Sequence, residues 1–577
     1  MAAAHPKKLS GWEAVTQQKR NDLLARIPRH WRLSERELCN AKTQTDARIV
    51  LPTFLSPVER AITSLPAPEL LHAIHTGDYT ACEVAGAFAH RAVLAHQLTN
   101  CLSEIDLASA MARAQELDVY FREHGRPSGP LHGLPVSLMD RFNVEGLDST
   151  CGFASWIGKP KNVEDEGVLL RSLRQAGVLI YCKTNVPMGA LVREGALLAL
   201  GGSAVGIATD LVGSSRIPSA FTGLAALKTS EGRLSASGIE TILKGLPVAS
   251  GTIGIMSQDV QSVELVFKAL LEDAPWRRDP DVIEMPWRPE KQYALQRRAG
   301  VPGQRSGRLV FGLLKCDGNV RPHPNIAEGL RHLEEALLED GHEVLEWKPP
   351  PHAGAVENLL KIFGSASGPA IIQAIKASGE PPVSSMLALY DQQNVTCSSA
   401  ADFWEMCQKR DDYRHAYANY WAQMDGCTAS GRPIDGIIMP VAATSAAREG
   451  EFSYLAYSAI ANVLDLPAFV FPVWRSGHSP SPGGFRHGNL SPSDCTVSET
   501  FREGDVQNMP VCLQVVCPRL QEESTLALAE VINDTLRREH ENLKRCCMGL
   551  KKFECMRNFL RHIATTCDYE ALPTCLQ

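Results

Sequence analysis

The stretch from Gly201 to Gly223, GGSAVGIATDLVGSSRIPSAFTG, constrains the fold more than any other part of the chain. The apolar run Ala204–Ala208 is typical of a buried strand, and it ends at Asp210. A turn of small residues follows and leads through Arg216-Ile217-Pro218 into a second apolar run. This order of segments indicates a strand followed by a tight turn in the core of an α/β protein.

Such a turn has two interpretations. The N–H groups of successive turn residues can converge on one point and form an oxyanion site, beside which Ser214 could attack a carbonyl carbon. The alternative is an ordinary strand-to-helix turn without a chemical role. Because Gly and Ser are common in any turn, the turn chemistry by itself favours this second interpretation.

The residues around the turn resemble the amidase signature family, whose motif reads G-T-D-x-G-G-S-x-R-x-P. This chain has A-T-D-L-V-G-S-S-R-I-P from Ala208 to Pro218. The resemblance extends from about Trp12 to Ile532 and is strongest to fungal acetamidase-like members. It implies an α/β fold consisting of one amidase-signature domain, in which a mixed central β-sheet is flanked by α-helices.

The resemblance also assigns roles to residues of the turn. It places Ser214 at the position of the catalytic nucleophile and the oxyanion donors at the backbone amides around Leu211, Val212 and Gly213. Asp210 and Arg216 take supporting positions next to this turn.

A second segment departs from the family pattern. Gly129–Asn143 reads GPLHGLPVSLMDRFN, and in the family this segment carries the catalytic lysine immediately before an aspartate. Here that position is Met139, followed by Asp140. A methionine side chain fills apolar space and can neither accept nor donate a proton. Lys183 is a weak candidate for a replacement base, because the equivalent lysine is present in active relatives without being their base.

The relay serine of the family is also missing. Relatives carry a G-G-S-S-G-G motif just before a glutamate, whereas this chain has only eight residues between Asn185 and Glu194, and none of them is serine. The first hypothesis is therefore an amidase that hydrolyses a carboxamide C–N bond through an acyl-enzyme on Ser214, with impaired turnover. The second is a pseudoenzyme, or a redeployed binding or accessory protein of fungal specialised metabolism. A misassembled coding sequence would also account for the short link.

The remaining sequence indicates the domain organisation. We expect an N-terminal helical arm over residues 1–60, an amidase-signature domain over 61–532 and a basic, cysteine-containing extension over 533–577. Within the domain, the Pro/Ser/Gly-rich segment 475–508 is expected to be a surface loop, and 276–306 a proline-rich connector. The extension has three open interpretations: a partner- or membrane-surface helix, a disordered appendage or a coding artefact.

Composition limits the partners. With a net charge of -7 and a pI near 6.2, the chain gives no reason to expect nucleic acid or an anionic membrane as partner. The N-terminus lacks the apolar core of a secretory signal, and the 17 cysteines are scattered, which predicts reduced thiols in the cytoplasm. No metal-spaced ligand cluster or nucleotide loop occurs, so no metal or other cofactor is expected. The predicted ligand is a small-molecule amide, and a homodimer stays open.

Overall fold

The computed structural model of the protein describes residues 11–44, 46–186, 194–242, 245–246, 248, 251–300, 309–382, 399–448, 450–474, 490–539 and 541. Within these residues, eleven strands form one sheet in the order β1-β3-β2-β4-β6-β5-β10-β11-β9-β7-β8. The strands are β1 (Leu102–Ile105), β2 (Pro135–Met139), β3 (Leu179–Thr184), β4 (Val205–Asp210), β5 (Ala225–Lys228), β6 (Thr252–Ser257), β7 (Val310–Leu313), β8 (Glu343–Glu346), β9 (Gly436–Pro440), β10 (Ala468–Trp474) and β11 (Val511–Val516).

Helices surround this sheet. In the N-terminal half they are α1 (Gly11–Arg26), α2 (Glu35–Lys42), α3 (Ala47–Val50), α4 (Pro57–Ser64), α5 (Ala67–Thr76), α6 (Ala81–Thr99), α7 (Leu107–His124), α8 (Val168–Gln175), α9 (Glu194–Ala199), α10 (Arg216–Thr222) and α11 (Val260–Glu272). In the C-terminal half they are α12 (Pro289–Ala299), α13 (Pro324–Glu339), α14 (His352–Ser378), α16 (Ala400–Asp425), α17 (Ala456–Val463), α18 (Pro492–Glu499) and α19 (Glu503–Val506). Residues 522–539 are also helical.

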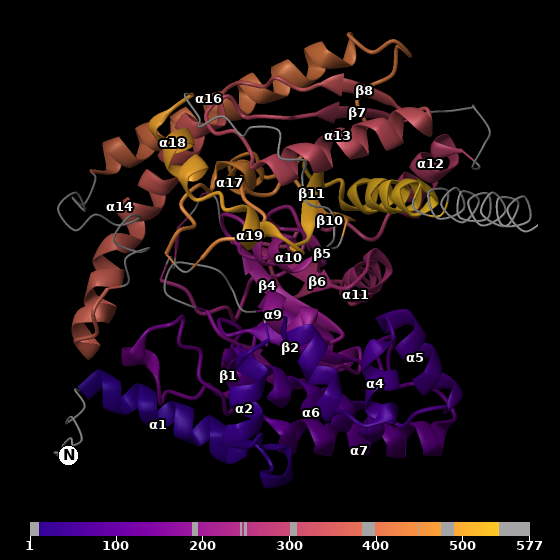
Figure 1. Ribbon diagram of the computed structural model, residues 1–577, viewed down its shortest axis with the longest axis vertical. Helices are drawn as coiled ribbons and strands as arrows, with labels where there is room; N and C mark the ends of the chain where they lie inside the picture. Colours follow the sequence, from indigo (N-terminus) through magenta and orange to yellow (C-terminus); the bar gives the residue numbers. More distant parts are fainter. Residues whose placement is uncertain are drawn as a thin grey trace, which may run out of the picture.

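The sheet is mixed, which confirms the expected α/β class with a central sheet flanked by helices. Strands β2, β3 and β4 run parallel to one another at one end, and β7, β8 and β9 do so at the other. The strands between them pair antiparallel. Every residue of β2, β4, β6, β9 and β11 is buried, because helices cover the sheet. Figure 1 shows β4 and α10 near the middle of the molecule, between the N-terminal helices and the β7–β8 end.

Several local signals in the sequence lead to the elements they predict. Thr80 and Glu83 form a capping box at the start of α6, as the T-x-x-E spacing indicates. Helix α5 ends at Gly77, which takes a left-handed φ of 82°. The apolar pattern between residues 308 and 347 corresponds to a β-α-β unit, in which β7 and β8 pair in parallel and α13 connects them.

Other segments differ from the expectation. The expected connector over 276–306 contains α12, which Pro289 begins from the first helical turn, where its missing N–H is not needed. The segment expected to be a surface loop over 475–508 is described from residue 490 onward, and there it forms α18 and α19. Asp494 of α18 is buried and pairs with Arg321, so this part belongs to the packed structure rather than to a loop.

The N-terminal helices share the main core. Leu23 and Ile27 of the α1 region belong to the same buried cluster as Leu526 and Ile532 near the other end of the chain. Helix α4 runs across residues 60 and 61, where the arm and the domain are expected to meet. The division into arm, domain and extension stays a prediction, and residues 542–577 lie outside the described part of the chain.

Candidate active site

Ser214 lies in the turn that joins β4 to α10. Strand β4 ends at Asp210, and α10 begins at Arg216, so five residues make the connection. Gly213 and Ser215 are buried on either side, whereas Ser214 is partly exposed. Ser214 is thus the partly exposed serine of this turn, and Ser215 is the buried one.

Asp210 holds this turn closed. Its Oδ1 accepts hydrogen bonds from the Gly213 amide at 2.8 Å and from Arg216 Nη2 at 2.9 Å. Its Oδ2 accepts from the Ser215 hydroxyl at 2.8 Å and from Arg216 Nε at 3.0 Å. The two Arg216 bonds form a bidentate pair, which is a strong and directional form of ion pair. Burial by itself raises the pKa of Asp210, but the Arg216 guanidinium outweighs it and holds that pKa well below its usual range.

The rest of the Arg216 guanidinium binds distant parts of the chain. Nη1 donates to the Ser458 carbonyl at 2.8 Å and to Gln514 Oε1 at 2.9 Å, and Nη2 donates to Asn462 Oδ1 at 2.7 Å. Arg216 is fully buried, and a buried charge is tolerated only when it is paired and hydrogen-bonded. Its donors are committed to the fold, so Arg216 supports the turn and does not face a ligand.

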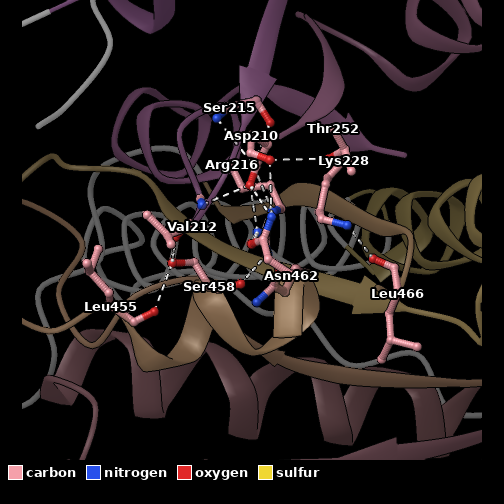
Figure 2. Close-up of polar contacts among 12 residues, drawn as sticks. Asp210, Val212, Ser215, Arg216, Lys228, Thr252, Leu455, Ser458, Asn462 and Leu466 are labelled. Atoms are coloured by element: carbon pink, nitrogen blue, oxygen red, sulfur yellow. Dashed lines mark hydrogen bonds and ion pairs between the residues drawn. The ribbon is translucent and has the colours of Figure 1, made fainter. Parts of the chain in front are cut away.

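Helix α17 contacts the turn from the other side, as Figure 2 shows for Ser458 and Asn462. The Ser458 hydroxyl donates to the Val212 carbonyl at 2.6 Å, and Asn462 Nδ2 donates to the Asp210 carbonyl at 3.1 Å. These two α17 residues are four apart and therefore lie on one face of the helix. Gly213 has a φ of 120°, and a Cβ there would lie 2.5 Å from Ser458 Oγ, so only glycine fits.

The amides of the turn divide into two groups. The Gly213 N–H points into the Asp210 carboxylate and is occupied. Among the hydrogen bonds of the described residues, none comes from the amides of Leu211, Val212 or Ser214, and none involves the Ser214 hydroxyl. These three N–H groups can still meet an oxygen that carries developing negative charge.

Met139 ends β2 beside the strand that leads into the turn. It is 2% exposed, and its Sδ lies 3.3 Å from both the amide nitrogen and the hydroxyl of Thr209. The neighbouring Asp140 accepts with Oδ2 from the amides of Thr150 at 2.8 Å and Cys151 at 2.7 Å. A thioether accepts only weak hydrogen bonds and carries no titratable proton, so this position offers no base.

Two buried lysines near the site are engaged elsewhere. Lys183 Nζ donates to the Ser149 hydroxyl at 2.9 Å and to the Asp148 carbonyl, and burial lowers its pKa. Lys228 Nζ donates to the carbonyls of Thr229 at 3.1 Å and Leu466 at 3.0 Å, and burial lowers its pKa to about 8. Both ammonium groups are bound to oxygens of the fold, away from the Ser214 hydroxyl.

Glu194 lies at the start of α9, on the strands next to the turn. Its buried carboxyl group accepts hydrogen bonds from the hydroxyls of Ser137 and Thr184, and burial raises its pKa to about 7. The position of the family's relay serine falls in 187–193, which lies outside the described residues. The absence of serine from this segment is a property of the sequence alone.

The sequence pattern singles out Asp210 and Arg216 but not their partners. Ser458, Asn462 and Gln514 follow the turn by more than 240 residues, and no local pattern connects them to it. Across the described ranges, no group of three or more His, Cys, Asp or Glu side chains could hold a metal ion. No helix in those ranges is long and apolar enough to cross a membrane.

The chain is similar to known proteins over most of its length. The family model described as Amidase matches residues 83–194 and 193–526. The chain is 33% identical to an acetamidase of Aspergillus oryzae over 556 residues, which covers 91% of this chain and 99% of that protein. It is 31% identical to an acetamidase of Emericella nidulans, covering 91% and 98%. Among solved structures, a fatty acid amide hydrolase aligns with a TM-score of 0.80 at 27% identity and covers 91% and 95%.

Proposed function

Because this chain belongs to the amidase family, whose members share the amidase signature, we propose that it is an amide hydrolase with Ser214 as nucleophile and with strongly impaired turnover. In the proposed reaction, Ser214 Oγ attacks the carboxamide carbon and the C–N bond breaks. The hydroxyl proton has to reach the leaving amine, and water then hydrolyses the acyl-enzyme. The proposed substrate is a small-molecule amide, and the proposed compartment is the cytoplasm.

The geometry of the turn supports the attack by Ser214 on the carboxamide carbon. Ser214 is the partly exposed serine of a connection that Asp210, Arg216 and α17 hold in place. The amides of Leu211, Val212 and Ser214, which donate to none of the described residues, could stabilise the oxyanion of a tetrahedral intermediate. Because these groups are positioned before a substrate binds, little reorganisation would be needed during the reaction.

The proposed impairment concerns the proton transfer. The single observation that supports it is Met139. Where the family resemblance requires a lysine, a buried thioether contacts Thr209. In another serine hydrolase, loss of the nucleophile or its base lowers kcat on the order of 10⁶-fold, while about 10³–10⁴ over the uncatalysed rate remains from binding and the oxyanion hole. We therefore expect slow residual hydrolysis at most.

The same observation favours a second candidate function. A turn with intact geometry and no base suits a pseudoenzyme, or a redeployed binding or accessory protein of fungal specialised metabolism that binds amides without cleaving them. The two candidates differ in whether Ser214 becomes acylated. Sequencing the transcript would distinguish both candidates from a misassembled coding sequence. A corrected sequence would still contain Met139 unless that codon also changed.

A serine-directed fluorophosphonate tests the proposal. We expect it to label the unmodified chain far more slowly than an active family member, and Met139→Lys alone to recover little. Met139→Lys combined with a G-G-S-S-G-G segment between Asn185 and Glu194 should restore amide hydrolysis, and Ser214→Ala should abolish it again. Rapid acetamide turnover by the unmodified chain, lost on Ser214→Ala, would refute the impaired site and indicate another base.

A further inference from the structure

A basic cavity lies at the C-terminal end of α1, far from the Ser214 turn along the chain. Its volume is about 650 Å³, and its lining residues are Asn21, Leu24, Ala25, Arg26, Ile27, Pro28, Arg29 and Arg32. Three of these residues are arginines, and none carries a carboxylate. Figure 1 shows α1 along the outer edge of the molecule. We propose that this cavity binds a phosphate-type dianion, as a phosphate monoester or a pyrophosphate group.

Two of the three arginines carry uncompensated charge. Arg32 donates from Nε to the Ile27 carbonyl at 2.9 Å and from Nη2 to the Ala25 carbonyl at 3.3 Å, and both acceptors are neutral. Arg29 is exposed, and within the described part of the chain its guanidinium makes no hydrogen bond or ion pair. The cavity therefore presents two guanidinium groups that have no carboxylate partner among the described residues.

The third arginine belongs to a balanced network. Arg26 Nη1 donates to Glu104 Oε2 at 3.2 Å, while Lys19 pairs with Glu104 and with Asp148. Two cations and two carboxylates cancel, so Arg26 supplies further N–H donors but no surplus charge. Asp22 lines the neighbouring cavity of about 390 Å³ instead and accepts a hydrogen bond from Gln18. The surplus of two charges matches a dianion.

The remaining features of the cavity favour an organic phosphate. Guanidinium groups present forked N–H donors that match phosphate oxygens. The partial negative charge of a helix C-terminus opposes an anion, but Arg32 covers the exposed carbonyls of Ala25 and Ile27. Leu24, which is 47% exposed, and Pro28 offer an apolar surface for the organic part. The volume lies within the range of small-molecule sites, about 300–1,000 Å³.

Calorimetric titration with pyrophosphate tests the site on the full-length protein. A parallel arm measures co-sedimentation with phosphatidylcholine vesicles with and without 5% phosphatidylinositol 4-phosphate, because the same group occurs on soluble molecules and on lipid headgroups. Arg29→Ala removes the exposed guanidinium, which makes no hydrogen bond to the described residues, and Arg20→Ala removes another exposed charge, on α1 and outside the cavity.

We expect saturable binding in one of the two arms and at least about tenfold weaker binding for Arg29→Ala, since this variant loses a charge-assisted hydrogen bond to the ligand. Arg20→Ala should change the affinity less than about twofold. Binding of pyrophosphate identifies a soluble ligand, and binding confined to the phosphoinositide vesicles identifies a headgroup. The proposal is overturned if neither arm shows saturable binding, or if both variants lose affinity equally, which would indicate bulk charge only.

Discussion

At the scale of single residues, Gly213 decides whether the turn around Ser214 can form. Its φ of 120° lies in the region that side chains avoid, and a Cβ would approach Ser458 Oγ to 2.5 Å. The same residue donates its amide to Asp210. The backbone conformation of the turn, its packing against α17 and its bond to Asp210 therefore all depend on Gly213.

Replacement of Gly213 by alanine should therefore strain the backbone and also displace Ser458 of α17. We expect Gly213→Ala to lower the free energy of unfolding by about 3 kcal/mol or more, from backbone strain and the contact with Ser458 together. Gly146→Ala is the matched control, because Gly146 has a φ of 75° and nothing within 4 Å of a built Cβ, so only about 1–2 kcal/mol is expected. Urea unfolding measures both values, and equal losses would contradict the contact argument.

Glu194 predicts a pH dependence of stability. Burial raises its pKa in the folded protein to about 7 from an ordinary value of 4.5, so between these two values the folded state binds more protons than the unfolded state. Stability is then full below pH 4.5, falls as the pH rises and levels off once it passes 7, with a loss on the order of 3 kcal/mol.

Glu194→Gln isolates this contribution, because an uncharged amide can keep hydrogen bonds to Ser137 and Thr184 without titrating. We expect the difference in unfolding free energy between the two proteins to change steadily from pH 4.5 to 7 in favour of the variant. Urea midpoints measured at intervals of half a pH unit provide the check. A difference that is independent of pH would show that Glu194 does not titrate in this range.

At the scale of elements, α17 is the support of the turn. Ser458 and Asn462 are on the same face of this helix and bond to Val212, Asp210 and Arg216. Gln514 of strand β11 accepts from Arg216 with Oε1. Its Nε2 donates to the carbonyls of Pro440 and Tyr457. The turn is therefore held by elements from the C-terminal half of the chain.

Truncation of one α17 residue should weaken this support. Asn462→Ala removes the acceptor of one Arg216 N–H and one of the two donors to the Asp210 carbonyl, which keeps the Thr252 hydroxyl, so we expect a loss of about 2–3 kcal/mol in unfolding free energy. The control is Asn358→Ala in α14, which removes one neutral bond to the Met406 carbonyl at 2.8 Å and should cost about 1 kcal/mol. If the Asn462 variant loses no more than the control, the turn does not depend on α17.

At the scale of the whole molecule, the N-terminal helices and the sheet form one body. Leu23 and Ile27 pack in the same cluster as residues of the helix at 522–539. Lys19 and Arg26 of α1 also pair with Glu104 of β1, a carboxylate that is 1% exposed. Loss of the arm would leave this buried carboxylate without its two cationic partners and, among the described residues, with only the Asp148 amide as a donor, which is strongly unfavourable.

We accordingly expect the arm and the sheet to lose structure in a single thermal transition. Differential scanning calorimetry of the full chain should give one peak, because apolar burial and the Glu104 pairs couple the two parts. A separate peak at lower temperature, missing from a chain that begins at residue 61, would show that the arm unfolds independently.

The sequence by itself determined the local elements and the chemistry available at each position. The capping box of Thr80 and Glu83 depends on neighbours three residues apart, and Met139 lacks a titratable group in any fold. The strand-to-turn order of Gly201–Gly223 and the family resemblance predicted the α/β class and the turn around Ser214. The connector predicted over 276–306 is wrong at Pro289–Ala299, where Pro289 begins α12.

Only the tertiary structure decided how the polar groups are used. Arg216 finds partners 242, 246 and 298 residues away, and Lys183 is bound to Asp148 and Ser149 instead of facing the turn. The sequence named the charged residues of the turn but not these bonds. Hydrogen bonding and desolvation depend on which distant segments pack together, and in this chain that packing also sets the raised pKa of Glu194.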